Sequence, residues 1–542
     1  MNHAELLLAA TLASPLVMLL ACLSGHLRTR MPSLLWLAPL PALAAALLAP
    51  NGSALVLPQA LLGLTFTLDV TGAMLLGTAA ILWSVAGIFA RADLQGRQDG
   101  GGFAVWWLAT LTGSLGVFIA ADLVSFYLLF TLVSLATYGL VVYDRTAAAR
   151  HAGAVYVALA LLCEAFLLFG FVLLAAATPD GSLSIRDAMA AFTMSPWRES
   201  ALALLVLGFG LKIGLVPLHI WMPSTYAAAP IPAAAVLSGA AVNAGVIGLI
   251  RFLPFETALP GWGEAIAAIG FLSAFYGVAI GLTQANPKVV LAYSSVSQMG
   301  LLAAVLGMGL ASGDKTAPVA AAFYAAHHAL VKGGLFLSVG MMMLTRSRSP
   351  WPLLLPAAVL ALALAGLPLT GGALTKLAVK TPLGAGTAGT LAALSAVGTT
   401  LLMLHFLHRL KLTASTGSAI PRGLTVVWLG TAFAAIVLPW ALSSTISTTL
   451  WRDALMPASL FEVSWPVALG GVLAIVLHRW QRLLPHVPEG DILVAGSGVA
   501  QAVRNMGTTV DRLDRNLRQW PVAATLLVTT ALVLAATMID WH

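Results

Sequence analysis

Residues 211–251 read LKIGLVPLHIWMPSTYAAAPIPAAAVLSGAAVNAGVIGLIR, and this stretch decides the fold of the chain. It begins with Lys212, a charged residue inside an apolar segment. Five helix-breaking residues follow before a second apolar segment: Gly214, Pro217, Pro223, Pro230 and Pro232. A lysine beside a broken helix at membrane depth is costly, and such backbone is tolerated only where protein or a water-filled cavity surrounds it. The stretch therefore predicts an ion pathway.

The composition is typical of a polytopic membrane protein. The chain has 542 residues, of which 60% are hydrophobic and 9% charged, whereas soluble domains carry about 25% charged residues. Residues 1–24 have neither the basic region nor the cleavage site of a signal peptide, so we expect a first transmembrane helix there. The net charge of +7 is not accompanied by a basic stripe interleaved with aromatics, which disfavours a nucleic-acid partner.

The sequence contains no motif for a cofactor. It has no phosphate-binding glycine loop, haem motif or iron–sulfur spacing. The only cysteines, Cys22 and Cys163, both lie in apolar segments, and two isolated cysteines make neither a metal cluster nor a disulfide framework. We therefore expect no cofactor and no catalytic redox site in this chain, which leaves open whether it is part of an enzyme.

Apolar runs near the length that crosses a bilayer, about 20 residues, recur along the whole chain. About sixteen are present, at 4–24, 33–50, 70–91, 103–120, 122–142, 153–177, 199–221, 231–253, 263–284, 288–311, 317–344, 352–378, 387–408, 423–443, 464–478 and 521–538. The run at 53–68 is ambiguous and fits a short hairpin or an interfacial segment. The predicted fold is an all-α polytopic membrane protein with about sixteen transmembrane helices.

The charges in the loops between these runs predict the topology. About 18 Lys and Arg side chains fall in the loops on one side and about 6 on the other, a strong bias that marks the cytoplasmic side. This places both termini outside. Residues 499–520, within the long inside segment 479–520, have apolar positions at helical spacing. They fit an amphipathic helix on the membrane or a partner, or a solvated connector.

A weak internal repeat divides the chain. Five helices at about 103–253 are followed by five at about 263–410, and the fourth helix of each set holds a lysine beside a Gly/Pro break, Lys212 and Lys376. Because five is odd, the second set is inverted, a pattern found in transporters. We expect N-terminal helices at 1–100, half-channels at 101–254 and 255–411, and C-terminal helices with an amphipathic cytoplasmic segment at 412–542.

Lys332 and His328 are the strongest candidates for proton transfer. They are four residues apart and share one face of a helix. Histidine exchanges a proton near neutral pH, and lysine can do so when it is removed from water. The alternative is a histidine bonded to nearby backbone and a lysine at a helix end. His327 points about 100° away from His328 and ranks lower.

Glu164 and Lys212 are further candidates for the relay, and His405 and His408 are weaker ones. Glu164 is a lone carboxylate in an apolar run, so it must be neutral or paired, and Lys212 is its obvious candidate partner. Lys212 itself could instead extend to the membrane surface. His405 and His408, near the end of the run at 387–408, could extend the path toward the inside. No carboxylate or cysteine joins the histidines at metal-ligand spacing, so we expect no metal site.

Four segments carry a family resemblance: KIGLVPLHIWMPSTYAAAPIPAAAVLSG from Lys212, KVVLAYSSVSQMG at Lys288–Gly300, HHALVKGGLFL at His327–Leu337 and LALAGLPLTGGALTK at Leu362–Lys376. With shorter segments they span about residues 60–410. The chain resembles the antiporter-like membrane subunits of respiratory complex I, the D subunit of Mrp cation/proton antiporters, and the large membrane subunit of hydrogenase 4 and formate hydrogenlyase. Within this family, the sequence is more similar to the Mrp D subunit and the hydrogenase-4 membrane subunit.

The resemblance implies roughly fourteen or more helices in two inverted five-helix repeats with hydrated half-channels. It matches Lys212 to the broken-helix lysine of the first half. In the second half it matches Lys332 to the central lysine, His328 to the histidine one turn before it, and Lys376 to the lysine of the second broken helix.

Two positions depart from the family pattern. Thr131, in FTLVSLATY, stands where the family has a glutamate, and Asn243 stands where Mrp-like members have a lysine. Either Glu164 is a relocated carboxylate, or the first half is a scaffold that does not conduct. The second repeat, with His328, Lys332 and Lys376, is therefore the better candidate for the conducting path.

These observations predict a proton- or sodium-translocating subunit of a multi-subunit membrane complex in a bacterial-type plasma membrane. The energy source must lie in partner subunits, including a soluble or peripheral catalytic one, or in the gradient of another ion. The alternatives are an Mrp-type cation/proton antiporter, a proton-powered subunit that energises a soluble partner such as an inorganic-carbon uptake protein, and a purely structural subunit.

Overall fold

The computed structural model describes residues 2–60, 62–97, 99–344, 350–413, 422–479 and 487. The predicted amphipathic segment 499–520 and the last predicted run, 521–538, lie outside the described residues.

The chain begins with helices and one β-hairpin. The helices are α1 (His3–Ala21), α2 (Gly25–Arg30), α3 (Leu40–Leu48) and α4 (Val70–Asp93). The ambiguous run at 53–68 forms the hairpin, whose strands β1 (Ser53–Leu57) and β2 (Leu64–Leu68) pair antiparallel, Ser53 opposite Leu68 and Leu57 opposite Leu64. The β-branched residues and alternating burial of β2 suit an extended strand.

Two groups of helices follow, each with a broken helix in fourth position. The first group is α5 (Gly100–Gly116), α6 (Leu123–Val141), α7 (Ala147–Ala177), the pair α9 (Arg198–Ile213) and α10 (Trp221–Ala228), and the pair α11 (Ile231–Val236) and α12 (Asn243–Phe252); α8 (Ile185–Phe192) lies in a connection. The second group is α13 (Pro260–Gly281), α14 (Pro287–Ser312), α15 (Ala317–Leu344), the broken helix formed by α16 (Trp351–Ala365) and α17 (Gly371–Ala378), the short α18 (Lys380–Leu383), and α19 (Thr387–Leu412). The described chain ends with α20 (Arg422–Leu442), α21 (Leu450–Asp453) and α22 (Pro457–Arg479).

Twelve helices within the described residues are long and apolar enough to cross a membrane. The predicted count of sixteen is not confirmed. Three of the predicted runs form shorter or interrupted helices: 33–50, which bends between α2 and α3; 103–120, whose helix α5 has 17 residues; and 352–378, which splits into α16 and α17. The all-α membrane architecture itself is as predicted.

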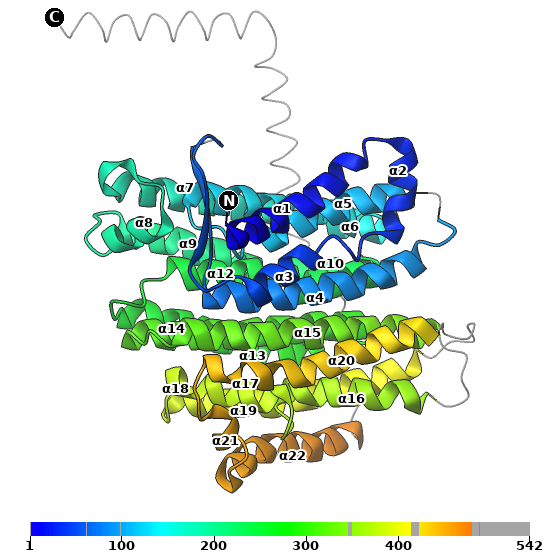
Figure 1. Cartoon of the computed structure of the whole chain (residues 1–542). Helices are drawn as coiled ribbons and strands as arrows, with labels where there is room; N and C mark the ends of the chain where they lie inside the picture. Colours follow the sequence, from blue (N-terminus) through cyan, green and yellow to red (C-terminus); the bar gives the residue numbers. More distant parts are fainter. Residues whose placement is uncertain are drawn as a thin grey trace, which may run out of the picture. The chain divides into compact units, whose positions relative to one another are not determined.

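The helices of residues 2–479 lie side by side in layers, with α14 and α15 in the middle (Figure 1). Helices α1 to α12 lie on one side of this pair, and α16 to α22 lie on the other (Figure 1). Helix α15 contacts α4, α11 and α12 from the first side and α16, α17 and α20 from the second. This helix, which carries His327, His328 and Lys332, therefore joins the two halves.

The two five-helix groups repeat the same pairings. The first helix of each group packs on the second, the third packs on the broken fourth, and the fourth packs on the fifth. These pairs are α5–α6 and α13–α14, α7–α9 and α15–α16, and α9–α12 and α16–α19. Because equivalent helices are an odd number of crossings apart, they run in opposite directions, as the inverted repeat requires.

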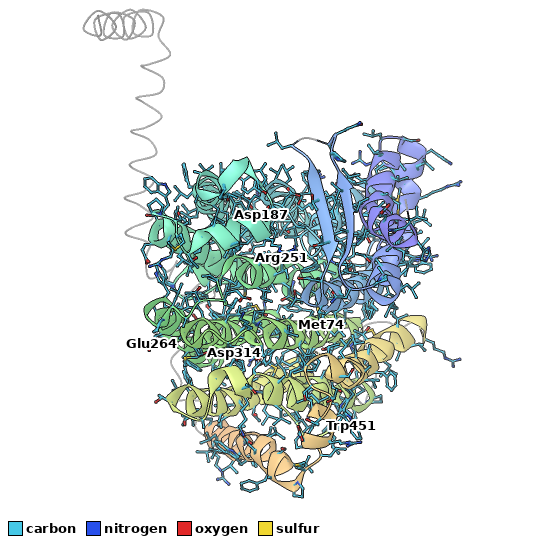
Figure 2. All side chains as sticks on the ribbon, turned by 60° about the vertical axis from the view of Figure 1, so that its left-hand side comes forward. Met74, Asp187, Arg251, Glu264, Asp314 and Trp451 are labelled. Atoms are coloured by element: carbon cyan, nitrogen blue, oxygen red, sulfur yellow. The ribbon has the colours of Figure 1, made fainter. Side chains whose placement is uncertain are left out.

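Small residues let α13 and α14 pack at backbone contact distance. The two helices are antiparallel: the start of α13, marked by Glu264, lies beside the end of α14, marked by Asp314 (Figure 2), and Leu259 N donates to Leu310 O at 2.9 Å. A Cβ added at Gly270 would lie 2.6 Å from Gly300 O. Membrane helices use small residues in this way to bring their backbones together.

Replacing Gly270 with alanine is therefore expected to destabilise the protein by about 1–3 kcal/mol, the usual cost of overpacking. Gly261, in the first turn of the same helix, has no atom within 4 Å of an added Cβ. Gly261→Ala is the matched control, and it should be neutral or slightly stabilising because alanine favours helices. Thermal unfolding in detergent measures both; equal effects would contradict the close α13–α14 packing.

Arg251, in the last turn of α12, fixes the end of the stretch 211–251 (Figure 2). Its Nη2 donates to Phe118 O at 2.6 Å and lies 3.5 Å from Asp69 Oδ1. Asp69 caps the N-terminus of α4 by accepting from Gly72 N at 2.7 Å. The second apolar segment is thus tied to the ends of α5 and α4.

Candidate ion pathway

The first broken helix ends directly after Lys212. Helix α9 stops at Ile213, and Gly214 follows in the left-handed conformation with φ 74°, which glycine adopts without steric cost. Two side chains satisfy backbone groups around the break: Trp221 Nε1 donates to Leu211 O at 2.9 Å, and Ser273 Oγ accepts from Val216 N at 2.9 Å. The break is thus enclosed by protein, as membrane depth requires.

Lys212 is buried and does not extend to the surface. The residue is only 7% exposed. The ammonium Nζ donates to Ser134 Oγ on α6 at 2.8 Å and lies 5.1 Å from the centroid of the Phe130 ring. The hydroxyl and the aromatic face both stabilise a cation, so the site suits a charged lysine in the membrane interior.

Glu164 on α7 contacts the residue that stands in the family's glutamate position. Thr131 Oγ1 donates to Glu164 Oε2 at 2.5 Å. Glu164 and its candidate partner Lys212 interact electrostatically, but no ion pair within 4.0 Å joins them in the described part of the chain. Ser134 instead lies between them: it accepts from Lys212 and also interacts with the carboxylate. Thr131, Ser134, Glu164 and Lys212 form what we call the first-half cluster.

Sequence reasoning missed Ser134, although a signal was available. Thr131 and Ser134 are three residues apart, which places both on one face of α6. Because Thr131 contacts Glu164, the Glu164 carboxylate occupies space that a longer acidic side chain at position 131 would reach. Its second oxygen, Oε1, is buried without a hydrogen-bond partner among the described residues.

Asn243 joins the first half to the second. It follows a single π-helical turn, η4 (Leu237–Ala241), a distortion often found at functional sites. Its Nδ2 donates to Gly239 O at 3.0 Å and to Ala325 O at 3.4 Å. Ala325 lies on α15, three residues before His328, so the amide holds the two halves together beside the second-half residues.

Lys332 and His328 are completely buried on α15, each with 0% exposure. Lys332 Nζ donates to Leu291 O on α14 at 2.7 Å. In the described residues no carboxylate pairs with Lys332, and neither ring nitrogen of His328 has a hydrogen-bond partner. A permanent charge at such a site is costly. The arrangement suits groups that change protonation in turn, and the i, i+4 placement is as the sequence predicted.

His327 faces the second broken helix. A Cβ added at Gly371 would lie 2.9 Å from its Cδ2, and one added at Gly372 would lie 3.3 Å from its Cε1. Both glycines begin α17, which carries Lys376, and His327 interacts electrostatically with that lysine. The direction away from His328 is therefore as predicted, but it points toward Lys376, which the sequence reasoning did not anticipate.

A row of polar side chains continues from His328 toward α19. Tyr324, one turn before His328, donates its hydroxyl to Gln298 Oε1 on α14. Gln298 Nε2 donates to Thr399 Oγ1 on α19 at 3.0 Å. Sequence reasoning did not single out these three residues. The segment SSVSQMG, which carries part of the family resemblance, contains Gln298 and was the available signal.

His405 and His408 lie at the end of α19 and are not part of this row. His405 Nε2 contacts Gln284 O at 2.8 Å. Both histidines line a cavity of about 590 Å³ together with Arg479 of α22. Among the described residues no three His, Cys, Asp or Glu side chains gather into a group that could hold a metal ion.

A family model described as "NADH:quinone oxidoreductase/Mrp antiporter, TM" matches residues 120–402, more than half of the chain. The chain belongs to this family. The matched range contains both broken helices and the candidate pathway residues from Thr131 to Thr399. The resemblance noted in the sequence is thereby confirmed.

Relatives from three kinds of complex are about equally similar. The chain is 30% identical to hydrogenase-4 component B of Escherichia coli, over 51% of this chain and 43% of that protein. It is 31% identical to NADH-quinone oxidoreductase subunit N of Desulforudis audaxviator (51% and 56%) and 31% to the Na⁺/H⁺ antiporter subunit A1 of Staphylococcus aureus (52% and 35%). The matches thus span about half the length of these relatives or less.

Two solved structures have the same fold. A chain of the Mrp complex from Dietzia superposes with a TM-score of 0.77 at 23% identity, covering 99% of this chain and 63% of that one. A chain of an archaeal membrane-bound sulfane sulfur reductase superposes with a TM-score of 0.69 at 22% identity, covering 86% and 99%. At these identities the likeness shows the antiporter-like fold of a multi-pass membrane protein.

Proposed function

We propose that the chain is a proton- or sodium-translocating, antiporter-like subunit of a multi-subunit membrane complex. The observation that carries this proposal is the placement of three lysines, Lys212, Lys332 and Lys376, within the family fold. Lys212 and Lys376 lie at broken helices, and Lys332 is buried without a carboxylate partner in the described residues. Intramembrane lysines that are retained at such cost mark ion pathways.

The conducting steps lie in the second half. Lys332 and Lys376 change protonation in turn, with His328 in the path and His327 facing Lys376. Protons pass between Lys332 on α15 and Lys376 on α17 through hydroxyl, amide and imidazole groups, which can donate and accept protons. Interactions between charges are strong in this interior because the effective dielectric constant is far below that of water. One proton transfer can therefore drive the next.

The first half supplies the trigger through the first-half cluster. Glu164 acts there as the relocated carboxylate, in contact with Thr131 and linked to Lys212 by Ser134. A change of charge on either ionisable group alters the electrostatic environment of the other. The contact with Thr131 favours this reading over a first half that serves only as a scaffold.

The driving reaction lies outside this chain. The relatives named above are subunits of a hydrogenase, a quinone oxidoreductase and a Na⁺/H⁺ antiporter, so partner subunits, including a soluble or peripheral catalytic one, or a second ion gradient would supply the energy. We place the complex in a bacterial-type plasma membrane with both termini outside, on the basis of the loop charges. An Mrp-type antiporter remains the principal alternative; a subunit that energises an inorganic-carbon uptake protein is another.

One experiment tests the proposal and separates these alternatives. The tagged chain is purified from its native host in mild detergent, its partners are identified by mass spectrometry, and the complex is reconstituted into sealed vesicles. An imposed sodium gradient should move protons if the complex is an Mrp-type antiporter, whereas reduction of a partner's substrate should do so in a redox complex. A complex that moves no ions under any driving force would contradict the proposal.

A further inference from the structure

A cavity leads from Lys376 toward the protein surface. It measures about 90 Å³ and lies between α17, α18, α19 and α22, with room for several water molecules. Lys376 lines it from α17, Ala396 from α19 and Glu462 from α22. Lys376 is partly exposed, in contrast to the fully buried Lys332. The cavity is therefore a space beside the lysine of the second broken helix that is large enough for water.

An ion pair stands at the outer part of this cavity. Lys380 Nζ donates to Glu462 Oε2 at 2.8 Å, and their side chains are 54% and 45% exposed. Both residues line the cavity, and both are exposed, whereas Lys376 is only partly exposed. The charged side chains of the described lining are these three alone. Glu462 is thus the acidic group of the site.

Glu462 lies outside the part of the chain that the family model matches, so that match gives it no role. It lies in the second turn of α22, beyond the matched residues 120–402. Helix α22 packs against α19 and α17, which places its carboxylate next to the second broken helix. A half-exposed ion pair contributes little to stability, so it can open and close readily.

We propose that the cavity is the surface access route to Lys376 and that Glu462 controls it by exchanging partners between Lys380 and protonated Lys376. The inference rests on the proposed function, because it requires Lys376 to gain and lose a proton. The ammonium of Lys376 competes with Lys380 for the carboxylate, since both cations border the same small cavity.

The proton balance of this step is simple. The Lys376 ammonium passes its proton through cavity water to the Glu462 carboxylate, leaving a neutral amine and a neutral carboxylic acid. The acid then releases the proton to water at the surface, and the restored carboxylate returns to Lys380. The same steps in reverse bring a proton in.

Thiol labelling tests the route without requiring transport. A single reporter, Ala396→Cys, is placed in the buried wall of the cavity after Cys22 and Cys163 are replaced by serine in the full complex. A membrane-impermeant thiol reagent is then added on each side of sealed vesicles. Glu462→Gln should raise the rate of labelling severalfold from the side that carries Lys380, because the neutral amide no longer holds the lysine across the mouth.

Two further variants sharpen the test. Glu256→Gln is the matched control, since it removes a carboxylate from another exposed ion pair, with Lys315, that does not border the cavity; it should change neither labelling nor ion flux. Lys380→Gln opens the mouth but keeps the carboxylate, so it should raise labelling and retain more flux than Glu462→Gln, which should lower flux severalfold.

Each outcome decides one part of the proposal. Labelling that is equal in the wild-type and Glu462→Gln backgrounds would overturn the access route. Raised labelling with undiminished flux in Glu462→Gln would overturn the proton-carrying role of the carboxylate. Absence of ion flux from every variant, the wild type included, would count against the proposed function, while the labelling contrast would still test the route.

Discussion

Lys332→Ala is expected to abolish ion transport in sealed vesicles while the complex still assembles. Lys332 is completely buried, and its ammonium has a backbone carbonyl, Leu291 O, as its hydrogen-bond acceptor. Removing a positioned proton-transfer group typically costs 10²–10⁴-fold, so we expect a loss of about 100-fold or more. Proton uptake followed with a pH-sensitive dye in reconstituted vesicles measures the effect.

Assembly should survive this change for a physical reason. The substitution removes a buried charge that no carboxylate compensates within the described residues, and Leu291 O still accepts from Ser295 Oγ. The remaining cost is the cavity left by the side chain. Lys315→Ala, at an exposed lysine in a loop, is the matched control and should transport normally. Full transport by Lys332→Ala would refute the second-half relay.

Glu164→Gln is expected to lower transport by about tenfold or more, and an acidic residue at position 131 should restore it. Glutamine has the size of glutamate but lacks its negative charge, which acts on Lys212 through Ser134. A tenfold effect corresponds to about 1.4 kcal/mol, a modest fraction of the interaction between two charges at an effective dielectric constant near 20.

The exchange variant is the decisive form of this test. Thr131→Glu combined with Glu164→Thr moves the carboxylate across the 2.5 Å contact to α6 and should recover most of the flux. Thr131→Gln combined with Glu164→Thr carries the same bulk without charge and should stay impaired. Thr131→Glu alone crowds two carboxylates and should also be impaired. Undiminished transport by Glu164→Gln would instead identify the first half as a scaffold.

The broken helices and the lysine–histidine spacing were predictable because they depend on local sequence. Glycine and proline fix where α9 ends and where α16 gives way to α17, and helical periodicity places His328 and Lys332 on one face. The hairpin at 53–68 was one of two predicted alternatives. These features need no knowledge of which helices are neighbours.

The links between the groups were not predictable because they depend on packing between helices. Ser134 lies between Glu164 and Lys212 only because α6, α7 and α9 meet there. His327 faces Lys376 because α15 packs on α17. The distance between Glu164 and its candidate partner Lys212 was open for the same reason, since periodicity gives the face of a helix but not the distance to its neighbour.

The number of helices was uncertain for a different reason. Apolar composition marks a run as membrane-compatible, but it does not decide whether the run is one straight helix. The run at 352–378 divides at Gly366, whose φ of 100° ends α16, and the run at 33–50 bends before α3. Breaks of this kind shorten helices without changing hydropathy, and one of them forms the second lysine site.

Charge movement in the variant that combines Lys212→Ala, Lys332→Ala and Lys376→Ala tests the central claim most directly. Vesicles containing the assembled complex are adsorbed on a solid-supported membrane, and the current that follows a pH jump is recorded beside the wild type. The proposed relay predicts a transient current in the wild type and none above the protein-free background in the triple variant. An undiminished current in the triple variant would mean that the chain is a structural subunit and that ions cross the membrane elsewhere.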